Sequence, residues 1–294
     1  MKPKATIVAN WRFQLGEGLH WDAERRLLWL VDILGKEIRW YDPASADTGS
    51  VTLPETVGWV LSVSGSTKVV VGLQSGIALC EPFERGSPIE WLDRRFPGDA
   101  GLRLNDAKID KFGRIWYGSV SMSNTSEPLA SLARYDPGGG TGTVIDDSYV
   151  VPNGPAFNRD CTVMLHTDSA RRVVYAYGLN AVTGLVQKRS IWRRFLEADG
   201  LPDGMTFDAD GCVWIAHWGG GRVCRYSPEG DLLLTVDMPT PHVTNVCFAG
   251  VNLDRVFVTS ARHGGSATGD PAAGALFEIL GVDVRGLPPW TLTL

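Results

Sequence analysis

The chain has 294 residues, of which 44% are hydrophobic and 21% charged, and a formal net charge of −5 at pH 7. This balance is typical of a globular protein with enough apolar material for a core. The negative charge argues against a nucleic-acid partner, which would require a basic surface facing the phosphates. The N-terminal residues lack the apolar stretch of a signal peptide, and no apolar run is long enough to span a membrane. We therefore expect a cytoplasmic protein with no membrane partner, and the sequence identifies no protein partner.

The five cysteines are odd in number and lack CxxC spacing. Each lies in or beside an apolar, strand-like run, where cysteine behaves as a small hydrophobe. We expect reduced thiols in the core rather than disulfides.

An apolar strand at residues 5–11 opens the chain and is followed by six units of similar pattern. In chain order they cover 25–43, 66–82, 113–137, 161–179, 211–230 and 254–279. In the first, third and fifth units, a turn with Asp or Gly precedes a strand that carries Trp. A second turn and a strand that ends in an aromatic residue before Asp-Pro or Ser-Pro complete these units. The Gly-rich stretches 137–142 and 263–274 are predicted to be surface loops, and the GGG at 219–221 a hairpin turn.

The residue that opens each unit recurs at intervals of 42 to 50 residues, at Glu17, Trp59, Asn105, Asn153, Asp203 and Asn245. A period of about 40–50 residues with several strands per repeat is typical of a propeller blade. The sequence therefore predicts an all-β protein, a six-bladed β-propeller formed as a single domain by residues 1–294. We expect the opening strand to pair with C-terminal sequence in the last blade, which closes the ring and removes two sheet edges.

Three of the opening residues carry strong oxygen donors: Glu17, Asn153 and Asp203. Each is followed by Gly, which allows a tight turn and a close approach of the backbone to a bound group. If the openers begin the innermost strands, they converge at one end of the channel. Two carboxylates and an amide oxygen suit one hard divalent cation with room left for water. A turn residue that satisfies its own backbone neighbours is the alternative for each of them. Three such residues at equivalent positions favour the metal site.

Four segments together resemble the gluconolactonase/regucalcin (senescence marker protein) family, within its sugar-lactonase branch: LGEGLHWDAERRLLWLVDI, RLNDAKIDKFGRIWYGSVSMS, VPNGPAF and PDGMTFDADGCVWIAHWGGGRV. They occur in the same order from about residue 12 to residue 280. The resemblance implies a six-bladed propeller with one divalent metal held by Glu17, Asn153 and Asp203. It also implies that Arg103 and Asn105 face the substrate. Some members have a carboxylate shortly after the strand that follows RxND, where this chain has Ser121, Met122 and Ser123.

The expected reaction is the hydrolysis of a small lactone, most simply a sugar (aldono-) lactone, by water attack on a metal-polarised carbonyl. A bound cation stabilises the oxyanion that develops on the carbonyl oxygen. Asp203 is the candidate to accept a proton from the water while also holding the metal. Arg103 offers a fork of donors, and Asn105 can donate and accept toward sugar hydroxyls. Asp106 should point away from Asn105 if the segment is extended, as a residue that supports the site or as a turn acid.

Other readings of the sequence stay open. The ion could be Ca²⁺, Zn²⁺, Mn²⁺, Mg²⁺ or Fe²⁺. The five histidines lack HxH or HExxH spacing and are predicted to be core or rim residues, and no G-x-S-x-G elbow occurs. Trp59 is either an apolar wall of the pocket or a packed core residue. The functional alternatives are another propeller hydrolase, of aryl-esterase or phosphotriesterase-like type, and a metal-binding propeller scaffold without activity.

Overall fold

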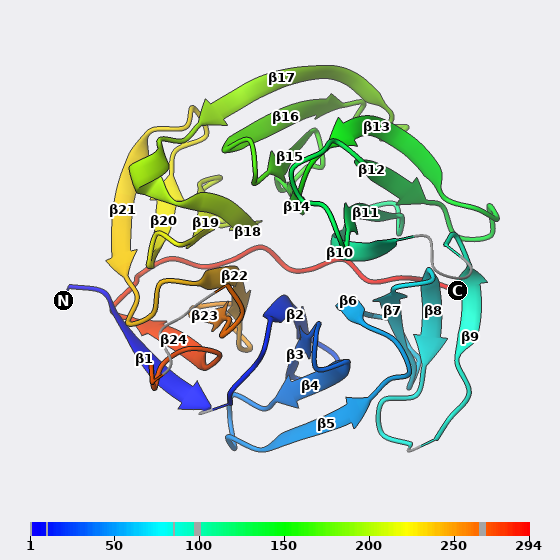
Figure 1. Ribbon diagram of the computed structural model, residues 1–294, viewed down its shortest axis with the longest axis horizontal. Coiled ribbons are helices and arrows are strands. Elements are labelled where there is room, and N and C mark those ends of the chain that lie inside the picture. The colour runs from blue at the N-terminus through cyan, green and yellow to red at the C-terminus, as the bar shows by residue number, and fades with distance from the viewer. Residues whose placement is uncertain (1, 10, 85, 97–100, 265–268) are drawn as a thin grey trace.

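The protein, described by a computed structural model over residues 2–9, 11–84, 86–96, 101–264 and 269–294, is built almost entirely of strands. Six four-stranded antiparallel sheets follow one another around a ring (Figure 1). Within the described ranges the helical content is one 3₁₀ turn, Glu197–Asp199. The predicted six-bladed β-propeller is confirmed.

The first three blades use consecutive strands of the chain. The first comprises β2 (Gly16–Asp22), β3 (Leu27–Asp32), β4 (Glu37–Tyr41) and β5 (Thr48–Thr52). The second comprises β6 (Val57–Ser62), β7 (Val69–Leu73), β8 (Ile77–Cys80) and β9 (Glu90–Asp93). The third comprises β10 (Leu102–Ile109), β11 (Ile115–Ser121), β12 (Ala130–Tyr135) and β13 (Thr143–Tyr149).

The next two blades follow the same plan, and the sixth is completed by the start of the chain. The fourth comprises β14 (Pro152–Phe157), β15 (Val163–Asp168), β16 (Val173–Leu179) and β17 (Val186–Arg194). The fifth comprises β18 (Leu201–Phe207), β19 (Val213–Trp218), β20 (Arg222–Tyr226) and β21 (Leu232–Asp237). The sixth comprises β22 (Val243–Ala249), β23 (Arg255–Ser260), β24 (Leu276–Leu280) and β1 (Lys4–Ala9). The antiparallel pairing of β1 with β24 confirms the predicted ring closure. The hairpin predicted at 219–221 joins β19 to β20, and residues 265–268 of the predicted loop 263–274 lie outside the described residues.

The first strand of each blade lies nearest the channel, and neighbouring inner strands contact one another around the ring (Figure 1). The residues that open the six repeats all lie on these strands: Glu17 on β2, Trp59 on β6, Asn105 on β10, Asn153 on β14, Asp203 on β18 and Asn245 on β22. Beside each of them the ladder with the second strand shifts register. Such irregularities redirect side chains and are frequent beside functional sites.

The tryptophans of the first, third and fifth units make the same contact. In each case the indole Nε1–H donates to a buried aspartate carboxylate that ends or follows the inner strand. The bonds join Trp29 to Asp22 at 3.1 Å, Trp116 to Asp110 at 2.8 Å and Trp214 to Asp208 at 2.9 Å. An arginine pairs with the same carboxylate in every case. Because a buried carboxylate is costly unless paired and hydrogen-bonded, this triad explains why Trp, Asp and Arg recur together.

The C-terminal segment crosses the ring (Figure 1). It is tied to the sixth blade by the Gly286 N–H, which donates to Leu253 O, and to the second blade by the Leu292 N–H, which donates to Ser62 O. The described part of the chain contains no helix with the length and hydrophobicity needed to cross a membrane.

Candidate metal and substrate site

Glu17, Asn153 and Asp203 lie near the starts of β2, β14 and β18, at the end of the channel that we call the mouth. All three side chains are buried, with 6%, 5% and 6% exposure. The charge on Glu17 acts on the carboxyl group of Asp203. The structure therefore brings the two carboxylates into one buried region.

The glycines that follow these residues serve two different purposes. Gly18 and Gly154 adopt φ angles of 61° and 81°, a left-handed conformation that favours glycine. Gly204 packs instead: a Cβ atom there would lie 2.4 Å from the Nδ2 of Asn245. The turn expected after each opener is therefore found in the first and fourth blades, and close packing replaces it in the fifth.

The oxygens of the two carboxylates differ in their contacts. The Oε2 of Glu17 accepts hydrogen bonds from the Gly18 N–H at 3.1 Å and from the Nδ2 of Asn245 at 3.0 Å. The Oδ1 of Asp203 is buried and has no hydrogen-bond partner among the described residues. A buried carboxylate oxygen without a partner is costly. A cation bound between these residues would satisfy it, so the residues present fit the predicted ion.

The acidic side chains at the mouth are buried close to one another, and this raises their pKa values. Burial, and then the charge of Asp106, raise the pKa of Glu17 to about 8. Burial and the charges of Glu17 and Asp106 raise the pKa of Asp203 well above its usual range. Burial lowers the pKa of Arg103 to about 10, although Glu17 and Asp203 oppose this effect. A divalent cation would relieve the repulsion between the acids, and its binding would release protons.

No group of three or more His, Cys, Asp or Glu side chains is placed to hold a metal ion within the described ranges. A metal site here would rely on two carboxylates and the Asn153 amide. Asp106 is not a free ligand, because its Oδ1 accepts from the Ala107 N–H at 2.8 Å and its Oδ2 from the Gly154 N–H at 2.9 Å.

These contacts correct the expectation that Asp106 points away from Asn105. Both side chains contact β14, because β10 is irregular between Leu104 and Ala107 rather than extended. Asp106 thus ties the third blade to the backbone next to Asn153.

Arg103 and Asn105 also lie at the mouth. Arg103 Nη1 donates to the Asn105 Oδ1 at 2.7 Å and to Leu104 O at 3.0 Å. Asn105 Nδ2 donates to the Asn153 Oδ1 at 2.7 Å and to Pro152 O at 2.8 Å. Of the two residues expected to face the substrate, Asn105 is bonded directly to a residue expected to face the metal, and Arg103 is linked to that residue through Asn105.

Two positions that the sequence left open have clear environments. Trp59 is fully buried in a core cluster, and its indole packs where a Cβ atom on Gly72 would stand. It is a packed core residue. Ser121 is buried opposite Leu102, and its Oγ accepts from the Asn124 N–H at 3.0 Å. Where some family members have a carboxylate, this chain therefore has a hydroxyl group that is hydrogen-bonded to the loop that follows β11.

Several residues that support the site were not predicted. Asp32 accepts from the N–H groups of Gln14 and Leu15, just before β2. Asp168 accepts from the N–H groups of Val150 and Val151, just before β14. The sequence does contain a feature that could have identified them: Asp32 and Asp168 each end the second strand of a blade, in LLWLVD and VMLHTD. Ser169, described below, belongs to the same group. Asn245 was predicted as an opener, but its bond to Glu17 was not.

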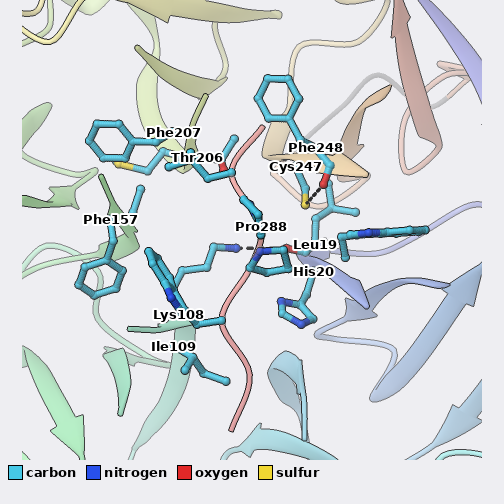
Figure 2. A pocket seen from close by; sticks show the side chains of 16 residues that line it. Leu19, His20, Lys108, Ile109, Phe157, Thr206, Phe207, Cys247, Phe248 and Pro288 are labelled. Atoms are coloured by element: carbon cyan, nitrogen blue, oxygen red, sulfur yellow. Dashed lines mark hydrogen bonds between the residues drawn. The ribbon is translucent and has the colours of Figure 1, made fainter. Parts of the chain in front are cut away.

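A partly open pocket lies at the opposite end of the channel, with a volume of about 70 Å³. Its walls are the later halves of β2, β10, β14, β18 and β22 and the crossing C-terminal segment, including Pro288 (Figure 2). Lys108 extends into the channel there and donates to Leu19 O at 3.1 Å (Figure 2). The pocket is mostly apolar, and Glu17, Asn153 and Asp203 do not line it. The chemistry of the mouth is therefore separate from this chamber.

Residues 15–262 match the family described as the SMP-30/Gluconolactonase/LRE-like region. The chain is 35% identical over 296 residues to the pentonolactonase XacC of Haloferax volcanii, with 96% of each chain covered. It is 33% identical to a 6-deoxy-6-sulfogluconolactonase of Pseudomonas putida, with 86% of this chain and 85% of the relative covered. The structure of regucalcin, a calcium-binding protein from Agrobacterium tumefaciens, superposes with a TM-score of 0.91 at 25% identity, covering 98% of this chain and 97% of that one.

Proposed function

Because the chain belongs to the SMP-30/gluconolactonase/LRE-like family, we propose that it is a metal-dependent lactonase that hydrolyses a sugar lactone to the corresponding sugar acid. The observation that carries this proposal is the pair of buried carboxylates at the channel mouth. Glu17 and Asp203 repel each other there, and one oxygen of Asp203 has no partner within the described residues. Such an arrangement is stable only if a proton or a cation neutralises it.

Glu17, Asn153 and Asp203 would hold the cation. A divalent ion in this position would polarise the lactone carbonyl and stabilise the negative charge that develops on its oxygen. The ligand atoms are all oxygens, which favours hard cations. Calcium is a natural first candidate because the similar regucalcin is a calcium-binding protein.

The other steps belong to residues of the chain. Arg103 orients the substrate through its remaining guanidinium donors, and Asn105 through its Oδ1, which can accept a second hydrogen bond from a substrate hydroxyl. Asp203 accepts a proton from the water molecule as the water oxygen bonds to the carbonyl carbon. The bond between this carbon and the ring oxygen then breaks, and the proton is delivered to the ring oxygen. The product is an open-chain hydroxy acid.

The lactone class is favoured over an aryl ester or a phosphotriester by two observations. The similar proteins above include two that are named for sugar lactones. The mouth also carries polar groups suited to sugar hydroxyls, Arg103 and Asn105. The cytoplasmic location expected from the sequence stays a prediction.

The experiment that tests the proposal is a hydrolysis screen over a panel of aldonolactones, followed by the fall in pH as acid is released. The protein is first stripped with a chelator and then assayed with and without each divalent ion. Hydrolysis of at least one sugar lactone that disappears with chelator and returns with an ion is expected. Turnover of aryl esters or phosphotriesters in preference to every lactone would contradict the proposal.

A further inference from the structure

We propose that Ser169 is a positioning residue that holds the amide group of Asn153 with its oxygen toward the cation site. This inference rests on the proposed function. Ser169 directly follows β15 and is 4% exposed. Its Oγ accepts a hydrogen bond from the Asn153 Nδ2 at 2.8 Å and donates one to Pro202 O at 2.6 Å.

The direction of these bonds follows from chemistry at the Ser169 end. Pro202 O is a backbone carbonyl and can only accept, so the single hydroxyl proton of Ser169 is directed to it. Toward Asn153 the hydroxyl must therefore act as the acceptor. The atom of Asn153 that faces Ser169 is consequently the NH₂ nitrogen, and the amide oxygen lies on the other side.

The same polarity follows independently from the opposite end. Arg103 can only donate, so Asn105 presents its oxygen to Arg103. The Asn105 nitrogen then faces Asn153 and Pro152 O. Pro152 O also can only accept, so two separate contacts, with Arg103 and with Pro152 O, give the same positions for the oxygen and nitrogen of the Asn105 amide. Asn153 must therefore present its oxygen to Asn105, in agreement with the orientation that Ser169 imposes.

The result is a one-way chain of hydrogen bonds across three blades: Arg103 to Asn105, Asn105 to Asn153, Asn153 to Ser169, and Ser169 to Pro202 O. It begins at a residue assigned to the substrate and ends at the carbonyl beside Asp203. Ser169 links the fourth blade to the fifth within this chain of hydrogen bonds, and thus connects two of the three proposed metal ligands.

Removal of the hydroxyl should affect both ends of this link. The Asn153 NH₂ group would lose its acceptor, so only the bond from Asn105 would hold the amide, and its oxygen would be less firmly directed toward the cation. Pro202 O would lose its donor next to Asp203. Loss of a partner that orients a metal ligand typically weakens metal binding by about 10–100-fold. We expect a weakening of this size in Ser169→Ala, without loss of the fold.

The test is calorimetric titration of the chelator-stripped protein with a divalent ion, using wild type, Ser169→Ala and Ser169→Thr. Thr keeps the hydroxyl and should bind the ion nearly as wild type does. The matched control is Ser62→Ala, because Ser62 is also buried and hydrogen-bonded, to His20 at 2.9 Å, but lies at the far end of its inner strand. Both alanine variants should lose some thermal stability in chelator, whereas only Ser169→Ala should lose ion affinity.

An ion affinity of Ser169→Ala within about twofold of wild type would overturn the inference, as would equal losses in Ser169→Ala and Ser62→Ala. If Ser169→Ala does not fold, Ser169→Cys replaces it, since a thiol is a weak partner of similar size, and the same outcomes apply. If wild type binds no ion, the proposed function fails first. The orientation of Asn153 is then decided by hydrogen exchange of its side-chain NH₂ group, which should be slower in wild type than in Ser169→Ala; equal rates would overturn the inference.

Discussion

Asn105 donates a hydrogen bond of 2.7 Å to the amide oxygen of Asn153 and so joins the third and fourth blades at the channel mouth. The oxygen that receives this bond is the one proposed to face the cation. Substrate binding and cation binding therefore share one hydrogen bond, and a change at Asn105 should affect both.

We expect Asn105→Ala to raise the KM for the lactone and also to weaken ion binding by about tenfold, since it removes a partner that orients Asn153. Steady-state kinetics and calorimetry on the same preparation measure the two effects. An unchanged ion affinity would show that the Asn105–Asn153 bond contributes nothing to the metal site.

Arg103→Ala should behave differently. It should raise KM, with a smaller loss in kcat if the contacts of Arg103 are equal in the ground and transition states. The ion affinity should not fall, because the guanidinium group is a positive charge that acts on Glu17 and Asp203 and hence repels a cation. Weaker ion binding in Arg103→Ala than in Asn105→Ala would contradict this division of roles.

Glu17→Ala should reduce ion affinity by orders of magnitude, because it leaves one carboxylate and one amide to hold a divalent charge. Calorimetric titration measures the loss, and Glu229→Ala, which removes an exposed glutamate, serves as the control. Near-normal binding by Glu17→Ala would refute the assignment of Glu17.

The buried Glu17 should also leave a pH signature in the metal-free protein. Its pKa rises from an ordinary value of 4.5 to about 8, so between these pH values the folded state holds a proton that the unfolded chain has lost. Because the folded state binds more protons in this window, the contribution of Glu17 to stability falls as pH rises and levels off above the folded pKa.

The measurement is thermal denaturation in chelator from about pH 5 to pH 9 for wild type and Glu17→Gln. The Tm of wild type should fall relative to that of Glu17→Gln as the pH rises toward 8, and an added divalent ion should reverse the difference. The comparison with Glu17→Gln is needed because burial also lowers the pKa values of His20, His166 and His217, which change stability in the opposite direction. Parallel Tm curves would contradict the prediction.

The fold could be predicted because each blade repeats one local pattern. The Trp of three repeats recurs because its indole donates to a buried Asp six or seven residues before it. The openers from Glu17 to Asn245 lie on the inner strands because each belongs to the first strand of its blade, directly before the apolar second strand. The pairing of the N-terminal strand with the last blade could be predicted because an unpaired strand edge must find a partner.

The contacts between blades could not be predicted in this way. The bond from Asn245 to Glu17 joins residues 228 positions apart, and that from Ser169 to Pro202 O joins 33. Glu17 and Asn245 are both openers, five repeats apart, but the repeat pattern does not show that their side chains meet. The separation of Ser169 and Pro202 is not a multiple of the repeat, and serine is not distinctive in a turn. The direction of Asp106 depends on the register shift in β10. The pocket at the far end depends on a C-terminal segment that lies outside the repeat altogether.

The sharpest test of the mechanism separates the two roles of Asp203. Asp203→Asn keeps an oxygen ligand of the same size but removes the base and one negative charge. General-base catalysis typically contributes about 10²–10⁴-fold, so kcat should fall by this factor even when the ion is added to saturation. Glu17→Gln is the matched control: it removes the same charge from the ion but leaves the base in place. At saturating ion its kcat should fall far less than that of Asp203→Asn. An ion-saturated Asp203→Asn enzyme that keeps more than about a tenth of the wild-type kcat would remove Asp203 from the role of base, whereas equal losses in the two variants would assign the effect to charge at the cation instead.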